Sequence, residues 1–284
     1  MKILQKNTIQ STTFTAILAG CFFSSIAHAD AISGASGLEA MQQLDANLVN
    51  QYTFAATATD DKEGSNNLTT TGSVSFADET ATLPGSGNYL TGMSVSITTG
   101  NSYTLEFLMR PSEASSSEAH IFSGNNNDRF YVYQDGSDLK ARFGNGSSIE
   151  TLSSISTDSA YYVAINIVYT DPTLGSGDDA KYTIDAWVGN QSTGTISQAL
   201  TGAEFDSDDS IDGFVSGLKI GAFVYNANSP WSGDLDSVAW YDDALTSTEI
   251  QNHFSAIPEP GSYALLLSGV ASLFVFGARK QRMK

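Results

Sequence analysis

The chain has 284 residues, of which 13 are basic and 31 acidic, so its formal net charge is −18. The imbalance is concentrated between residues 30 and 256, where seven basic and 30 acidic residues leave a net charge of −23. Such a surface repels nucleic acid and anionic lipid and favours divalent cations or neutral partners, although solubility outside the cell would explain most of these carboxylates. The length allows one domain of about 220 residues between two targeting segments, with a core that needs no disulfide.

Residues 1–29 have the three parts of a secretory signal peptide. Lys2 and Lys6 form its basic start, residues 14–26 its apolar core, and Ala27 and Ala29 its small-residue cleavage site. The run Leu-Ala-Gly-Cys ending at Cys21 also fits a lipoprotein cleavage motif, which would leave that cysteine lipidated. We favour ordinary cleavage because the apolar run continues beyond Cys21. The mature chain then has no cysteine for a disulfide, a metal site or a nucleophile.

Residues 257–284 form a second targeting segment. Pro258, Glu259 and Pro260 precede an apolar run at 263–278, and the chain closes with four cations, Arg279, Lys280, Arg282 and Lys284. As a helix the run would be about 24 Å long, shorter than a hydrocarbon core of about 30 Å, which suits a transmembrane segment that is recognised and then removed. Cations after the apolar run keep that end in the cytoplasm.

This order of triplet, short span and basic end resembles the PEP-CTERM sorting signal of Gram-negative bacteria. The resemblance implies processing by an exosortase-type membrane enzyme. It also implies export with a tether to the inner membrane in transit, followed by delivery to the cell surface or extracellular matrix. A plain tail anchor is the alternative.

An amphipathic helix is predicted within residues 30–50. Ser36 and Glu39 have the spacing of a capping box, and Leu38, Met41, Leu44 and Leu48 recur at helical spacing. This lead-in helix is expected to pack on the main domain.

From residue 51 to 256 the hydrophobic period changes to two, with Gly, Asn and Asp turns between the runs. Strands are predicted at 51–56, 73–76, 80–83, 94–98, 103–110, 119–122, 129–134, 139–143, 161–169, 181–188, 218–225 and 235–241. No helices are interleaved, so the predicted fold is an all-β jelly-roll sandwich. A capping box from Thr246 to Glu249 predicts a closing helix with Ile250 and Phe254 inward.

The end of this domain carries its most specific pattern. The run 231–250, WSGDLDSVAWYDDALTSTEI, resembles the closing signature of laminin-G-like, concanavalin-A-like jelly rolls. Three further stretches match that family in order: Tyr52-Thr53-Phe54 followed by Asp61 and Gly64, then 103–111, then 217–221. The resemblance implies a binding module for carbohydrate or protein that often holds one structural calcium.

By this resemblance, Asp61 and Asp236 are the expected calcium ligands that would join the two ends of the domain, with Asp60 and Asp234 as near alternatives. The other reading is that Asp236 caps or pairs inside the sheet without metal. A second acidic run, 206–213, is interpreted as a solvated loop because Lys219 stands where a calcium loop needs a bidentate acid.

No catalytic constellation is recognisable. The strand-borne acids of glycosidases related to this fold are missing: Glu106 is expected to pair with Arg110 on one strand face, and Glu204 stands beside a polar loop. His120 and His253 have no triad partners in the sequence.

Sugar-stacking aromatics are sought beside turns, where Tyr133, Tyr225 and Trp231 are the candidates, with core packing as the alternative for each. The leading hypothesis is therefore a non-catalytic binding module for extracellular polysaccharide or a matrix protein. The alternatives are a structural matrix protein without a specific ligand and, less favoured, a glycoside hydrolase.

Overall fold

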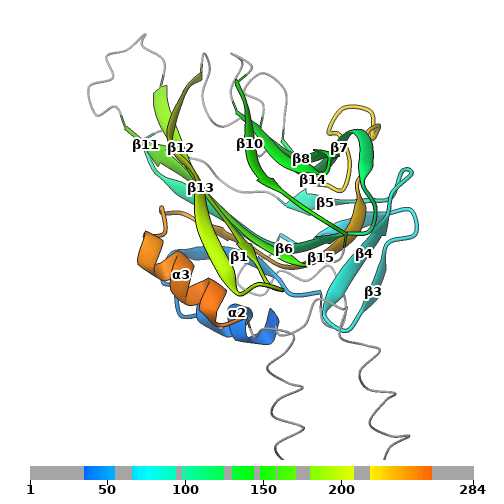
Figure 1. Ribbon diagram of the computed structural model, residues 1–284, viewed down its shortest axis with the longest axis horizontal. Coiled ribbons are helices and arrows are strands. Elements are labelled where there is room, and N and C mark those ends of the chain that lie inside the picture. Colours follow the sequence, from blue (N-terminus) through cyan, green and yellow to red (C-terminus); the bar gives the residue numbers. More distant parts are fainter. Residues whose placement is uncertain are drawn as a thin grey trace, which may run out of the picture. The chain divides into compact units, whose positions relative to one another are not determined.

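Two antiparallel sheets form a β-sandwich in the computed structural model (Figure 1), which describes residues 35–54, 66–93, 98, 100–124, 130–143, 148–157, 159–170, 180–207 and 218–257. The eight-stranded sheet has the order β13-β12-β11-β6-β15-β4-β3, with β1 paired to β15. The seven-stranded sheet has the order β10-β9-β8-β7-β14-β5-β2. The predicted all-β sandwich is confirmed at this level.

The described residues form the following helices and strands. In chain order they are α2 (Ala35–Gln42), β1 (Leu48–Tyr52), β2 (Thr69–Thr71), β3 (Ser75–Ala77), β4 (Thr80–Pro84), β5 (Tyr89–Met93), β6 (Tyr103–Pro111), β7 (Ser115–Ser123), β8 (Phe130–Gly136), β9 (Asp138–Phe143), β10 (Ser148–Ser154), β11 (Tyr161–Tyr169), β12 (Ala180–Asn190), β13 (Thr195–Ser207), β14 (Leu218–Ile220), β15 (Ser232–Tyr241) and α3 (Ser247–Ser255).

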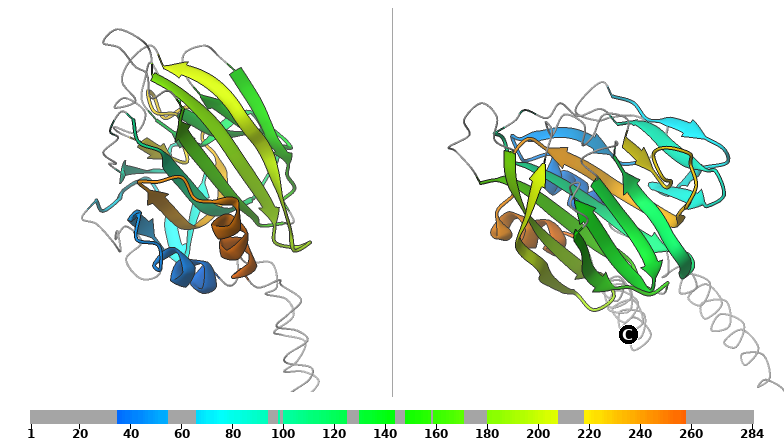
Figure 2. Two further views of the ribbon diagram at one scale, coloured as in Figure 1. Left: turned by 90° about the vertical axis from the view of Figure 1, so that its left-hand side faces the viewer. Right: turned by 90° about the horizontal axis from the view of Figure 1, so that it is seen from above.

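The two sheets face each other (Figure 2), and the core side chains lie between them. Strand β6 illustrates why: Leu105, Phe107 and Met109 point inward and are fully buried, while Thr104 and Glu106 alternate onto the other face. That other face is also buried, because α2 and α3 pack on the outer side of the eight-stranded sheet. Polar residues on one face of a strand therefore do not show that this face is exposed to solvent.

The closing helix matches its prediction. Thr246 is the N-cap of α3 and forms a reciprocal capping box with Glu249, and Ile250 and Phe254 are buried. Gly189 makes room for this helix, since a Cβ there would meet the ring of Phe254 at 2.4 Å.

The lead-in helix is shorter than predicted. It ends at Gln42, a turn follows, and Leu48 already belongs to β1, while Leu44 is 78% exposed. Ser36 lies inside the helix and is not its N-cap. The turn is fixed by the carboxylate of Asp45, which accepts a hydrogen bond from the backbone N–H of Asn47 at 2.8 Å, an arrangement that competes with helix.

Several strand boundaries also differ. Strands β2, β5, β10 and β13 were not predicted at these positions, and the predicted strand 218–225 ends at Ile220. The acidic run expected to be a loop from 206 begins inside β13, and its residues 208–213 lie outside the described part of the chain.

No helix in the described residues is long and apolar enough to cross a membrane. The predicted signal peptide, the Pro258–Pro260 triplet, the apolar run and the basic end all lie outside the described residues.

Candidate functional site

A buried polar cluster lies beneath the two helices. The Glu106 carboxylate accepts hydrogen bonds from Gln42 Nε2 at 2.9 Å, from Tyr241 Oη at 2.6 Å and from the hydroxyl of Tyr162, and His253 Nδ1 lies 2.9 Å away. All five side chains are buried. They come from β6, α2, β15, β11 and α3, so the cluster joins both helices to the sheet.

The charges in this cluster support one another. Burial alone would raise the pKa of Glu106, but the hydrogen bond and charge of His253, together with the hydroxyls of Tyr162 and Tyr241, hold that pKa below its ordinary value. Burial alone would lower the pKa of His253, but its hydrogen bond to Glu106 and the charge of that carboxylate raise it. Between the lowered pKa of Glu106 and the raised pKa of His253, the pair is a carboxylate and an imidazolium enclosed by protein, and its role is to stabilise the fold.

The expected pairing of Glu106 with Arg110 is wrong. Arg110 instead forms an ion pair with Asp234, with Nη2 and Oδ2 2.7 Å apart, and Asp234 Oδ1 also accepts from Thr82 Oγ1 at 2.7 Å. Glu106 and Arg110 share a strand face, but the helices cover Glu106 and leave Arg110 partly exposed at the margin of the sheet.

The predicted calcium ligands divide into two groups. Asp60 and Asp61 lie outside the described residues. Asp234 forms an ion pair with Arg110. Asp236 is buried, and the Oδ1 atom of Asp236 has no hydrogen-bond partner. Burial and the charge of Glu39 raise the pKa of Asp236 well above its ordinary value. Such an orphaned oxygen suits a cation, but no group of three or more potential ligands occurs within the described ranges, so the calcium site with Asp61 stays a prediction.

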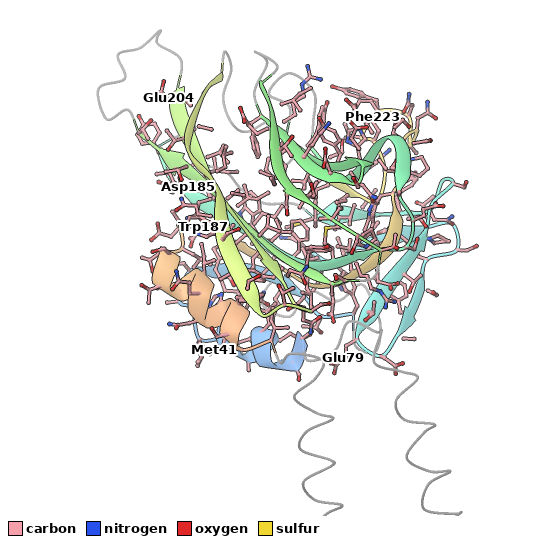
Figure 3. The ribbon with its side chains drawn as sticks, viewed as in Figure 1. Met41, Glu79, Asp185, Trp187, Glu204 and Phe223 are labelled. Atoms are coloured by element: carbon pink, nitrogen blue, oxygen red, sulfur yellow. The ribbon has the colours of Figure 1, made fainter. Side chains whose placement is uncertain are left out.

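A cluster of aromatic rings, here called the aromatic platform, lies on the outer face of the seven-stranded sheet over β7 and β8. It consists of His120 on β7, Tyr131 and Tyr133 on β8, and Phe223 and Tyr225 in the loop after β14. The ring of Phe223 lies 4.9 Å from His120, 5.6 Å from Tyr131 and 5.2 Å from Tyr225 between centroids. Figure 3 shows Phe223 on the side of the sandwich away from the helices.

The loop that carries Phe223 and Tyr225 is held by its backbone. Gly221 N–H donates to Ile121 at 2.8 Å, Trp231 N–H donates to the Gly221 carbonyl at 3.0 Å, and Val224 N–H donates to Ser123 Oγ at 3.0 Å. Gly221 has φ +90°, and a Cβ there would meet Leu83 at 2.2 Å, so the turn out of β14 requires glycine. A ligand would meet a largely preformed surface.

Of the three aromatic candidates from the sequence, only Tyr225 is open to solvent, at 47% exposure. Trp231 is fully buried and donates its Nε1–H to Gln134 Oε1 at 3.0 Å, which excludes it from stacking on a ligand in this structure. Tyr133 is a buried member of the platform, and burial with the charges of Glu118 and Asp135 raises its pKa to about 12.

Sequence reasoning missed Phe223, Tyr131 and His120 as members of the platform. The alternation in β8 places Tyr131 and Tyr133 on one face and was available as a signal. Phe223 was hidden because the run 218–225 was predicted to continue as a strand, whereas the chain turns at Gly221.

No protein-family model matches the sequence, and no curated protein does. Solved structures share the fold. Domain 4 of AbnA, a GH43 extracellular arabinanase from Geobacillus stearothermophilus in complex with arabinotriose, is 16% identical with a TM-score of 0.51, over 73% of this chain and 98% of that one.

Two larger proteins contain a similar domain. A mutant Trypanosoma rangeli sialidase displaying trans-sialidase activity is 13% identical with a TM-score of 0.54, over 75% of this chain and 34% of its own. A structure of botulinum neurotoxin type C, whose cell entry depends on interaction with two ganglioside molecules, is 10% identical with a TM-score of 0.51, over 77% of this chain and 52% of its own. These likenesses define the fold as a β-sandwich.

Proposed function

We propose that the domain is a non-catalytic carbohydrate-binding module of the laminin-G-like, concanavalin-A-like type. The observation that carries this proposal is the aromatic platform, which ends in a half-exposed tyrosine on a loop held by backbone hydrogen bonds. Exposed aromatic rings on a rigid surface bind at low entropic cost and are frequent anchors of binding sites. The arabinanase domain, whose structure contains arabinotriose, supports this choice by analogy of fold only.

The proposal includes export through the PEP-CTERM-like segment to the cell surface or extracellular matrix, with an exosortase-type enzyme as processing partner. The helices that bound the described domain, α2 and α3, lie on the outer face of the eight-stranded sheet, opposite the platform. Replacing Pro258, Glu259 and Pro260 by alanine should leave the chain unprocessed in a host with such an enzyme, as seen by immunoblot.

The binding test uses the full-length protein in non-ionic detergent against a panel of soluble polysaccharides, with calcium and then with EDTA. Saturable binding should weaken about tenfold in Tyr225→Ala, since truncating an aromatic anchor commonly costs 1–2 kcal/mol. Leu44→Ala is the matched control, because Leu44 is also exposed but lies beside the helices. Absence of binding to every polysaccharide would favour the structural-matrix alternative.

A further inference from the structure

A row of paired residues crosses the outer face of the seven-stranded sheet beside the platform. The register pairs Thr91 with Lys219, Lys219 with Ser123, Ser123 with Tyr131, and Tyr131 with Arg142. Residues directly opposite each other in antiparallel strands point to the same face, so these five side chains, here called the basic row, share one surface. Lys219 and Arg142 are three strand spacings apart, about 14 Å.

The basic row is unusual for so acidic a domain. Five of the seven basic residues between 30 and 256 fall within the described ranges, and three of these five, Lys140, Arg142 and Lys219, lie on this face. Lys140 is neutralised by Asp135, with Nζ and Oδ2 2.7 Å apart. Lys219 and Arg142 have no carboxylate within salt-bridge distance among the described residues.

The two cations have local surroundings that leave hydrogen-bonding capacity. Lys219 Nζ lies 4.7 Å from the centre of the Tyr89 ring, and Arg142 Nε is buried without a hydrogen-bond partner. The acidic residues of this face lie away from the basic row. Asp135 is opposite Asp138 in the strand register near the β8–β9 turn, and Glu118 lies beside His120. Lys219 and Arg142, which have no carboxylate partner among the described residues, therefore lie together on the basic row, and the acidic residues lie outside it.

We propose that this face binds an acidic polysaccharide, with carboxylate or sulfate groups at Lys219 and Arg142 and sugar rings on Phe223 and Tyr225. This inference rests on the proposed carbohydrate-binding function and names its ligand class. A guanidinium recognises a planar carboxylate or sulfate through paired N–H donors, and a lysine supplies a mobile charge. At 0.15 M salt the Debye length is about 8 Å, so repulsion from distant acids is screened while contacts remain.

The test compares polymers that differ only in charge. Full-length protein in non-ionic detergent is titrated by calorimetry with polygalacturonate and with its neutral methyl ester, then with a sulfated galactan and with the same galactan after desulfation. We expect binding to the charged member of at least one pair to be about tenfold tighter. The pair that shows the difference identifies carboxylate or sulfate as the recognised group.

Variants locate the contact. Lys219→Gln and Arg142→Gln should each weaken binding to the charged polymer about tenfold and leave binding to the neutral one unchanged. Lys140→Gln is the matched control, since it removes the same charge from the same face at a residue already paired, and it should change affinity less than twofold. Arg142→Lys keeps the charge and should retain more affinity than Arg142→Gln, which separates charge loss from misfolding.

The outcomes separate the two proposals. Equal binding of charged and neutral polymers, with loss in Tyr225→Ala, would overturn the acidic-ligand inference and leave the carbohydrate-binding function intact. Binding to no polymer would overturn both. An effect of Lys140→Gln as large as that of Lys219→Gln, or equal binding of inorganic polyphosphate, would show a diffuse charge effect and overturn the inference.

Discussion

The ion pair between Glu106 and His253 should make the fold sensitive to the substitution His253→Gln. This change removes the positive partner and leaves a fully buried carboxylate with three neutral donors, Gln42, Tyr162 and Tyr241. Removing one partner of a buried pair costs about 3–5 kcal/mol, and the three remaining hydrogen bonds favour the lower end. For a domain of this size, about 3 kcal/mol lowers the melting temperature by about 6–12 °C.

The pH dependence follows from the directions of the two shifts. The pKa of Glu106 is lowered, so its contribution is present above the ordinary value of about 4.5 and lost as pH falls through the folded pKa. The pKa of His253 is raised, so its contribution is present below about 6.5 and lost as pH rises through the folded pKa. The pair therefore stabilises the fold most between about pH 4.5 and 6.5.

The assay is thermal unfolding of full-length wild type and His253→Gln from pH 4.5 to 9, followed by circular dichroism. The difference in melting temperature should be largest near pH 5.5 and should shrink as the pH rises through the raised pKa of His253. A difference below 2 °C at pH 5.5, or one that grows with pH, would refute the assignment of a buried charged pair. His120 is unchanged in both proteins, so its titration cancels in the comparison.

Three further substitutions test other parts of the structure. Burial lowers the pKa of His120 to about 4, so its titration should lower the free energy of unfolding of wild type by about 3 kcal/mol between pH 6.5 and pH 4. The free energy of unfolding of His120→Phe should fall much less over the same range, as measured by urea unfolding at both pH values. Asp236→Asn should raise the melting temperature at pH 7.5, because the raised pKa of Asp236 makes its ionisation destabilising as pH rises. A calcium-induced rise confined to wild type would support the predicted site with Asp61, and no rise in either protein would count against it. Gly233→Ala should cost about 1–3 kcal/mol in urea unfolding, since its Cβ would meet the Trp231 ring at 2.3 Å and the Arg110 carbonyl at 2.5 Å; an unchanged midpoint would contradict this packing.

The sequence pattern correctly predicted the elements whose structure depends mainly on neighbouring residues in the chain. Tyr161–Tyr169 has the bounds that were expected, because a long β-branched and aromatic run shows no helical periodicity that would compete with the strand. The Thr246 capping box needs only two residues three positions apart. The lead-in helix was predicted too long because Leu44 and Leu48 kept a helical spacing across the turn at Asp45. The spacing of hydrophobic residues does not reveal where a side-chain hydrogen bond will end a helix.

The site was less accessible to prediction, since its parts meet only in the folded chain. Glu106 gains its partners from Gln42, 64 residues away, and from His253, 147 residues away, so a strand position that looked solvated is enclosed. Tyr131 and Phe223 come together only because the chain leaves β14 at Gly221 and folds over β7 and β8.

The two outer faces of the sandwich are used differently, and this division explains where a ligand would bind. On the eight-stranded sheet, the buried polar cluster fixes α2 and α3 over the central strands, so this face stabilises the domain. On the seven-stranded sheet, the described residues place a short loop instead of a helix over β7 and β8, and its Tyr225 ring remains half exposed. Lys219 and Arg142 add charge on the same side without carboxylate partners among the described residues. Because a cation in an acidic domain is readily neutralised by a neighbouring acid, as Lys140 is, the two that are not neutralised are the stronger indication of an external anion.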